Sequence, residues 1–431
     1  MKKTIFWFRR DLRLEDNRAL YEALGSGLPV IPIFIFDKEI LTHFNDPKDK
    51  RVNFIHQRLE ALQEQLKDFG ANLRVFHSTP FEVFKNLISN EKVESVYANR
   101  DYEPTAIKRD QIISDLLFKN RVSFHSFKDQ VIFEGNEILK ADRNPYTVYT
   151  PYKNKWLQNL TAKDTASFMS EKILDNFLKE KSAPIMTLED IGYEKTGDIF
   201  SVATVDKKKL KDYHLKRDTP SIDGTSLQGI HLRFGTISIR HYVREAKKTN
   251  DTWLSELIWR EFFSQILFNF PNVVDQEFKE KYRKIPWSKN QEKFKKWCSG
   301  MTGFPIVDAG MRELNETGHM HNRVRMITAS FLVKDLQIDW RLGERYFASK
   351  LLDYDLASNN GNWQWASSSG CDAAPYFRIF NPTTQMEKFD PDLIYVRKWV
   401  KEYGTSEYVK PMVDHKVARE ITLALYKDNL N

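Results

Sequence analysis

The chain has 431 residues, of which 41% are hydrophobic and 29% charged, enough for a large core in about two or three domains. Its apolar runs are shorter than the roughly 20 residues that a membrane-spanning helix needs. The apolar start is interrupted at Arg9, Arg10 and Asp11, too early for a signal peptide. A net charge of +7 permits a polyanionic partner without requiring one. These features exclude a membrane protein and predict a cytoplasmic one.

Residues 1–130 alternate short β-like runs with helical runs. The predicted strands are Thr4–Phe8, Val30–Phe36, Leu73–His77, Ser95–Ala98 and Val122–Phe127, and the predicted helices are Arg51–Phe69, Pro80–Asn90 and Pro104–Asn120. The alternation predicts an α/β domain with a doubly wound parallel sheet, a fold that binds ligands at the carboxyl ends of its strands. A GxGxxG motif does not follow any of these strands, so a standard dinucleotide site is not predicted there.

Composition divides the rest of the chain into two parts. Residues 131–211 are irregular, with several prolines and the lysine-rich run at 207–211, and we expect an interdomain linker there. Helical periodicity dominates residues 212–431, which predicts a larger all-α domain. Ten tryptophans, most of them after Trp253, are either stacking platforms or large core residues.

The most informative segment lies between Asp353 and Gln385. It combines carboxylates, amides, Trp363, Trp365 and Arg378 with little aliphatic bulk. Burying such groups without partners costs about 2–7 kcal/mol each, so this composition does not suit a hydrophobic core. It suits a binding site in which aromatic rings stack on a flat ligand and polar groups bind its heteroatoms.

A predicted helix at Thr252–Phe270 carries a mixed polar stripe. Glu256, Trp259, Arg260 and Phe263 fall on one face because they are three or four residues apart. Leu254, Leu257 or Ile258, Phe262 and Ile266 form the opposite, core-facing side. The polar stripe is either a solvated surface or the wall of a cleft.

A second predicted helix contains the segment from His319 to Met326. Histidines two residues apart do not point together on a helix, so His319 and His321 are not expected to bind a metal, and Cys298 and Cys371 are expected to be free thiols. Arg323 and Arg325 can bind phosphate or pair with Asp353 or Asp355. Likewise, Gly224-Thr225-Ser226 is either an N-cap or a phosphate-binding turn.

Together, these segments resemble the photolyase/cryptochrome family of flavoproteins along essentially the whole chain, most closely its class I enzymes for cyclobutane pyrimidine dimers. The matching stretches are Trp7–Asn17, Ser255–Phe262, Thr302–Ala309, Met320–Ser330 and the segment around Trp363. The resemblance implies FAD bound in the helical domain and light-driven repair of UV-damaged DNA. It implies an alternative as well, a cryptochrome that senses blue light, although signalling members usually carry a C-terminal extension and this chain ends soon after Arg419.

The resemblance also implies the FAD contacts. Asn359 is expected to face the reactive flavin nitrogen N5, and Arg325 to pair with Asp353 beside the ring. The chain departs from the family at Leu227-Gln228-Gly229, where a hydroxyl expected near the diphosphate is missing. The full set of expected cofactor contacts is Tyr213, Thr225, Ser226, Leu227, Gln228, Gly229, Trp253, Arg260, Arg325, Asp353, Asp355 and Asn359.

Met326 separates the repair classes within the family. Enzymes for (6-4) photoproducts have a histidine at this position as proton donor, whereas a thioether only packs against a thymine dimer as a polarizable surface. The resemblance assigns Glu256 and Asn322 to the polar edges of the dimer, together with Met326 and Asn359 as catalytic residues. Trp259 and Trp365 are expected to stack on the dimer, which photolyases flip out of the duplex. The expected DNA contacts are Arg217, Arg323, Arg378 and Gln385.

Three tryptophans, Trp363, Trp340 and Trp287, match the family's electron-transfer chain that photoreduces the flavin. A second, antenna chromophore is expected in the α/β domain, but Pro104-Thr105-Ala106 replaces the Asn-Glu pair of folate-binding members, so a deazaflavin, a flavin, folate and an empty pocket all stay open. We expect a monomer with no obligatory protein partner and no metal.

Overall fold

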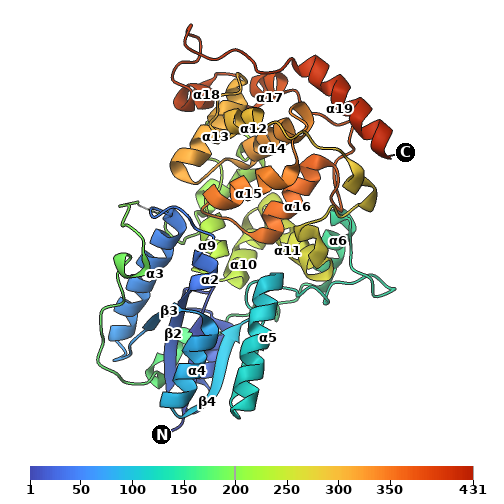
Figure 1. The fold of residues 1–431 in the computed structure, drawn as a ribbon. Coiled ribbons are helices and arrows are strands. Elements are labelled where there is room, and N and C mark those ends of the chain that lie inside the picture. The colour runs from blue at the N-terminus through green and yellow to red at the C-terminus, as the bar shows by residue number, and fades with distance from the viewer. Residues whose placement is uncertain (199, 431) are drawn as a thin grey trace. The chain divides into compact units, whose positions relative to one another are not determined.

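The computed structural model describes residues 1–198 and 200–430 and divides the chain into two compact units (Figure 1). Unit 1 comprises residues 1–134, 159–205 and 227–248, and unit 2 comprises residues 135–158, 206–226 and 249–431. Within the described ranges, every helix is too short or too polar to cross a membrane.

Unit 1 contains a five-stranded parallel sheet in the order β3-β2-β1-β4-β5, which confirms the predicted doubly wound α/β fold. All five predicted strands are present, with ends shifted by no more than two residues. The chain winds outward from β1 to β3 and then returns to the other side of β1, so the strand order reverses between β1 and β4. The strands are β1 (Lys3–Phe8), β2 (Val30–Asp37), β3 (Arg74–Ser78), β4 (Val93–Asn99) and β5 (Ser123–Phe127).

The helices of unit 1 bury apolar faces against this sheet. Ile5, Ile33 and Val96 from the strands meet Phe84 and Leu117 from two helices in one core. Figure 1 shows the helices α4 and α5 that carry Phe84 and Leu117 beside each other along the sheet. The helices are α1 (Arg18–Leu24), α2 (Lys38–Leu41), α3 (Lys50–Lys67), α4 (Pro80–Asn90), α5 (Pro104–Lys119), η1 (Ser170–Lys172), η2 (Leu174–Asn176), η3 (Glu189–Ile191), α9 (Gly229–Arg233) and α10 (Ile239–Thr249).

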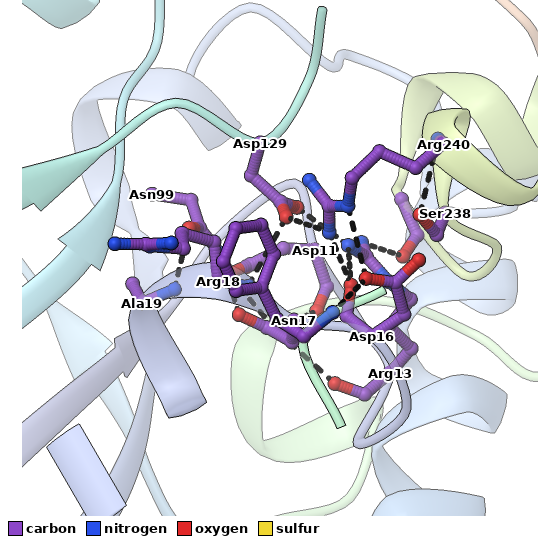
Figure 2. A network of polar contacts seen from close by, with 12 residues as sticks. Asp11, Arg13, Asp16, Asn17, Arg18, Ala19, Asn99, Asp129, Ser238 and Arg240 are labelled. Atoms are coloured by element: carbon purple, nitrogen blue, oxygen red, sulfur yellow. Dashed lines mark hydrogen bonds and ion pairs between the residues drawn. The ribbon is translucent and has the colours of Figure 1, made fainter. Parts of the chain in front are cut away.

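A buried polar network lies at the carboxyl ends of the strands of unit 1 (Figure 2). Asp129, which follows β5, accepts hydrogen bonds from Arg13 (2.6 Å) and from Arg240 of α10 (2.7 Å). Asn99 at the end of β4 donates to Asp11 beyond β1 (2.6 Å). Because Arg240 belongs to a late segment of the chain, this network joins residues 227–248 to the sheet.

The regular elements of unit 2, among its described residues, are all helices, and its main core is built around Trp297, Val324, Leu332 and Trp340. Helix α16 contacts α11, α14 and α15, and these four helices carry half of the predicted site residues (Figure 1). The helices are α6 (Tyr149–Asn159), α7 (Lys207–Lys211), α8 (Tyr213–Lys216), α11 (Asp251–Asn269), η4 (Pro271–Val274), η5 (Glu280–Lys284), α12 (Gln291–Cys298), α13 (Pro305–Thr317), α14 (Asn322–Ser330), the π-helix η6 (Phe331–Asp335), α15 (Trp340–Lys350), α16 (Leu356–Ser367), α17 (Pro382–Phe389), α18 (Ile394–Trp399) and α19 (His415–Leu430).

Two local predictions are corrected by the structure. Helix α14 begins only at Asn322, so His319 and His321 precede it, and His321 is its N-cap. Helix α9 begins at Gly229, with Gln228 as its N-cap, so Thr225 and Ser226 do not open a helix.

The domains predicted from composition are consecutive ranges, 1–130, 131–211 and 212–431. The compact units are defined by spatial contacts, and their segments interleave along the chain. The sequence-based division therefore stays a proposal. Part of the expected linker, residues 135–158, belongs to the helical unit, and residues 159–205 belong to the unit with the sheet.

Candidate active site in the helical unit

A small cavity of about 80 Å³, open to solvent, lies between α14 and α16. Three predicted lesion-binding side chains, Asn322, Met326 and Trp365, share it with predicted flavin contacts. The full lining is Asn322, Arg325, Met326, Ala329, Phe347, Leu351, Asp353, Tyr354, Asp355, Ser358, Asn359, Asn362, Trp363, Trp365 and Ala366. The segment that composition singled out therefore does form one wall of a cavity.

Helix α16 separates its amides between two faces. Its N-cap, Asp355, accepts a hydrogen bond from the backbone nitrogen of Ser358 (3.0 Å), which starts the helix at the cavity edge. Asn359 lines the cavity, whereas Gln364 on the opposite face donates to the carbonyl of Val273 (2.9 Å) and holds η4. A side chain at Gly361 would collide with Phe263 of α11, so glycine permits the close approach of these two helices.

The orientation of the Asn359 amide is set by Glu344 of α15. The Nδ2 of Asn359 donates to Glu344 Oε1 (2.8 Å) and to the Glu344 carbonyl (3.1 Å). With Nδ2 committed, Oδ1 is the Asn359 atom left to accept a hydrogen bond from a ligand. Burial raises the pKa of Glu344, and the hydrogen bond from Asn359 opposes that rise.

Arg325 and Asp353 form the ion pair that the resemblance implied. Both carboxylate oxygens of Asp353 accept from Arg325 Nη2, at 3.1 and 2.9 Å. The guanidinium is also fixed by its Nε, which donates to the carbonyl of Met320 (2.7 Å). An arginine held in this way places a fixed positive charge at the cavity wall.

The other expected cofactor contacts fall into both units. Tyr213, Thr225, Ser226, Trp253 and Arg260 belong to unit 2, and Leu227, Gln228 and Gly229 belong to unit 1. The side chain of Gln228 is used inside unit 1, where Oε1 accepts from the Tyr242 hydroxyl (2.6 Å) and Nε2 donates to the Val202 carbonyl (3.1 Å). Both ends of the Gln228 amide are thus hydrogen-bonded within the protein. The glutamine at this departure from the family pattern therefore has a structural role.

Glu256 and Arg217, two of the predicted substrate contacts, form an ion pair with each other. The Glu256 side chain is 32% exposed. Burial raises the pKa of Glu256, and the charge of Arg217 opposes that rise. Glu256 and Trp259 do not contribute to the lining of the cavity, so the predicted lesion residues are not all brought together.

One face of Trp259 is covered by Tyr149 of α6. The two rings are nearly parallel, 7° apart, with centroids separated by 3.6 Å. The Tyr149 hydroxyl donates to the carbonyl of Ser255 (2.8 Å), which ties α6 to the helix that carries Trp259. The sequence analysis missed Tyr149 because it lies in the expected linker, although Tyr149, Tyr152 and Trp156 have helical spacing and are all buried.

The predicted DNA contacts lie on several elements of unit 2. Arg323, on the first turn of α14, packs its guanidinium over the Phe389 ring at 4.3 Å and pairs with Asp218 (2.8 Å). Arg378 is exposed in the loop before α17, and Gln385 lies half-buried on α17. Arg323 and Arg378 carry the positive charge that favours contact with a phosphate backbone, and Gln385 offers an uncharged amide, so the DNA contacts stay a prediction.

Trp363 and Trp340 are almost fully buried, at 2% and 0% exposure, and Trp287 is half-buried. A side chain at Gly343 of α15 would collide with Trp363, so the helix that starts with Trp340 packs directly on this indole. Trp297, which the sequence analysis did not single out, meets Trp363 edge to face with centroids 6.1 Å apart. Core packing alone accounts for these positions, and the electron-transfer role stays a prediction.

The cavity residues fit FAD by their chemistry. A flavin ring needs acceptors for its N–H groups, donors for its carbonyls and an apolar surface for its dimethylbenzene edge. Asp353, Asn359 and Arg325 offer the polar groups, and Phe347 with Leu351 offers the apolar surface. A parallel α/β unit, and a helical unit whose cavity has this chemistry, together match what a flavin-binding protein requires.

Comparison with known proteins agrees with this class. Residues 253–406 match the FAD binding domain of DNA photolyase, and residues 4–170 match the DNA photolyase domain. The deoxyribodipyrimidine photo-lyase of Vibrio cholerae is 37% identical over 98% of this chain and 99% of that protein. The chain therefore belongs to the DNA photolyase family.

Solved structures resemble the whole chain. A class III photolyase from Agrobacterium tumefaciens has a TM-score of 0.88 at 34% identity, covering 99% of this chain and 98% of that one. An archaeal photolyase from Sulfolobus tokodaii with two FAD molecules has a TM-score of 0.83 at 32% identity, covering 99% and 100%. A cryptochrome from Synechocystis has the same TM-score at 25% identity, covering 99% of both chains.

Proposed function

We propose that this protein is a light-driven DNA-repair lyase that binds a cyclobutane pyrimidine dimer in DNA and restores the two pyrimidines. The observation that carries the proposal is the shared cavity, in which Asn322, Met326 and Trp365 stand beside Asp353 and Asn359. A substrate held by the first three residues would lie next to a flavin held by the last two. Reduced FAD, once bound, would supply the light-driven electron transfer that opens the cyclobutane ring and would take the electron back.

The residues of the chain bind and orient the two reactants. Asn359, whose amide nitrogen is held by Glu344, would offer its amide oxygen to the flavin, and the Arg325–Asp353 pair would help to hold the ring. Asn322 hydrogen-bonds the polar edge of the dimer, and Met326 and Trp365 provide a soft, apolar surface. Ring opening needs an electron and its return but no obligatory general acid, so a methionine at position 326 suits this substrate. A (6-4) photoproduct would need a proton donor there.

The assignment includes further predicted roles. Glu256 and Trp259 complete the lesion wall, and Arg217, Arg323, Arg378 and Gln385 contact the DNA backbone. Trp363, Trp340 and Trp287 carry electrons to oxidised flavin. We also propose that the protein is a class I enzyme, although one of the similar solved structures is a class III photolyase.

We also propose the oligomeric state, the cellular location and the antenna chromophore. The protein acts as a monomer, without an obligatory protein partner, on DNA in the cytoplasm. The α/β unit holds an antenna chromophore, for which the two FAD molecules of the Sulfolobus tokodaii protein support a flavin. Sedimentation with and without DNA tests the first statement, and extraction of the pigments tests the last.

The decisive experiment is photorepair of UV-irradiated oligo(dT) by the purified protein with its flavin reduced. Recovery of absorbance at the thymine band under blue light, with none in the dark, is the expected result. A duplex with a (6-4) photoproduct serves as the control substrate and should remain unrepaired. Failure to revert dimers with fully reduced flavin would sink the proposal and favour a cryptochrome, the class of the Synechocystis neighbour.

A further inference from the structure

Asp218 lies between the two arginines that the proposed function assigns to DNA, Arg217 and Arg323. Its Oδ1 is 2.8 Å from Arg323 Nη2 and 3.9 Å from Arg217 Nε. All three residues belong to unit 2, and Arg217 and Asp218 directly follow helix α8. A carboxylate therefore occupies the position where a DNA phosphate would neutralise both side chains.

Arg323 has unused hydrogen-bonding capacity. Its Nε is buried and has no partner among the residues that the structure describes, and its Nη1 faces the weak acceptor Met326 Sδ at 3.8 Å. Asp218 is thus a strong hydrogen-bond acceptor for the Arg323 guanidinium, which has donors left for a second strong acceptor. The Phe389 ring also contacts the Arg323 guanidinium, so the orientation of the guanidinium does not depend on Asp218 alone.

Exposure identifies the member of this cluster that can leave. The Asp218 side chain is 41% exposed, compared with 17% for Arg323, 25% for Arg217 and 32% for Glu256. Exposed ion pairs are weak because water competes for both charges. An incoming phosphate can therefore replace the Asp218 carboxylate at small cost, whereas Glu256 remains paired with Arg217.

We propose that Asp218 is an internal competitor of the DNA backbone, a carboxylate that occupies the phosphate position between Arg217 and Arg323 and lowers their affinity for DNA. With Asp218 and Glu256 charged, the two arginines are neutralised inside the protein. Loss of the Asp218 charge leaves one positive charge free for a phosphate. This inference rests on the proposed function, because it requires that the arginines bind DNA.

Asp218→Asn tests it by equilibrium binding in the dark to a duplex containing one cyclobutane dimer and to the same duplex undamaged. We expect about two- to fivefold tighter binding of the dimer duplex at low salt, the range set by one exposed ion pair. The slope of log K against log salt should change little, because both arginines meet the backbone in the wild type as well once Asp218 is displaced. Asp218→Glu, which keeps the carboxylate, should bind as the wild type does.

The matched control is Asp428→Asn, an equal change of net charge at an exposed position of α19. Binding by Asp218→Asn that equals this control, or that is weaker than the wild type, would overturn the inference and make Asp218 a residue that orients the arginines. A wild-type protein that does not bind the dimer duplex at all would overturn the proposed function, and this inference with it. Arg323→Ala separates the two cases, since it should weaken binding and flatten the salt slope.

Discussion

At the scale of single residues, the neighbours of a side chain decide which of its chemical properties are used. Asn359 and Asn360 are adjacent and chemically identical, yet Asn359 lines the cavity and Asn360 donates to the carbonyl of Val273 (2.8 Å). The composition of the segment predicted a site but could not separate these two amides. The difference arises because consecutive residues on a helix point about 100° apart.

Trp363 offers a residue-scale test of the electron path. Trp363→Phe should slow photoreduction of the oxidised flavin more than tenfold, equivalent to about 1.4 kcal/mol in activation free energy. The reason is that the phenyl ring of phenylalanine is much harder to oxidise than the indole of tryptophan. Repair by chemically reduced protein should be nearly unchanged. Transient absorption and a single-turnover repair assay measure the two quantities.

Trp399→Phe, on α18, is the control for loss of an indole elsewhere in unit 2. Equal loss of photoreduction and repair in Trp363→Phe would refute the electron-transfer role and leave Trp363 as a packing residue. Trp297, in edge-to-face contact with Trp363, is the next position to replace in that case.

At the scale of elements, helix α14 depends on an uncharged histidine. The backbone nitrogen of Arg323 donates to His321 Nδ1 (3.2 Å), so this N-cap needs Nδ1 unprotonated. Burial, together with the neighbouring His319, lowers the pKa of His321 to about 4. The other charged groups that act on the ring are Glu313, Asp218 and Arg325.

The pH dependence of stability follows from this lowered pKa. Above pH 6.5 both folded and unfolded chains carry a neutral His321, and the cap contributes fully. As the pH falls from 6.5 towards 4, only the unfolded chain takes up the proton, so up to about 3 kcal/mol of stability is lost. His321→Asn keeps a capping acceptor that does not titrate, and should lose less stability over this interval.

Chemical unfolding at a series of pH values measures the effect. The exposed His43→Asn serves as the control and should follow the wild type at every pH. Identical pH profiles for wild type and His321→Asn would show that the cap does not govern acid stability.

At the scale of the whole molecule, each compact unit is made of three separate segments of the chain, so contacts between residues far apart in sequence hold each unit together. The network in Figure 2 does this for residues 227–248, because Arg240 binds Asp129 (2.7 Å) and Asp16 (2.9 Å). Burial raises the pKa of Asp129, but the charges of Arg13 and Arg240 outweigh it and leave the pKa below its usual value. The carboxylate is therefore kept ionised in the interior of unit 1.

Arg240→Met should destabilise unit 1 by about 3–5 kcal/mol, because removing one partner leaves buried charges uncompensated. Hydrogen exchange should then accelerate in peptides of residues 9–17 and 227–248 and stay unchanged in α13 and α14. Arg244→Met is the matched control on the same helix. Arg244 is 31% exposed, lies 4.0 Å from Asp16 and donates to the carbonyl of Thr165, so its loss should cost about 1 kcal/mol, clearly less than the loss of Arg240. Similar exchange in both variants would contradict the structural role of the network.

The sequence by itself determined the local elements and the chemistry of the site. The five strands and the helices α3, α4 and α5 were predicted to within a few residues, since periodicity and prolines at helix starts are local signals, whereas the short helices α1 and α2 were not predicted. The polar composition around Trp363 and the motif resemblance predicted the family and its flavin, and the family comparison confirmed both.

Only the tertiary structure decided how distant residues meet. Tyr149 on Trp259, Glu344 on Asn359 and Asp218 on Arg323 are contacts between segments that the sequence separates, and each changes what the second residue can do. The physical reason is that periodicity reports which face of an element is buried, but not which side chain covers it. That choice depends on the packing of whole helices, and it turns a polar segment into a cavity with defined donors and acceptors.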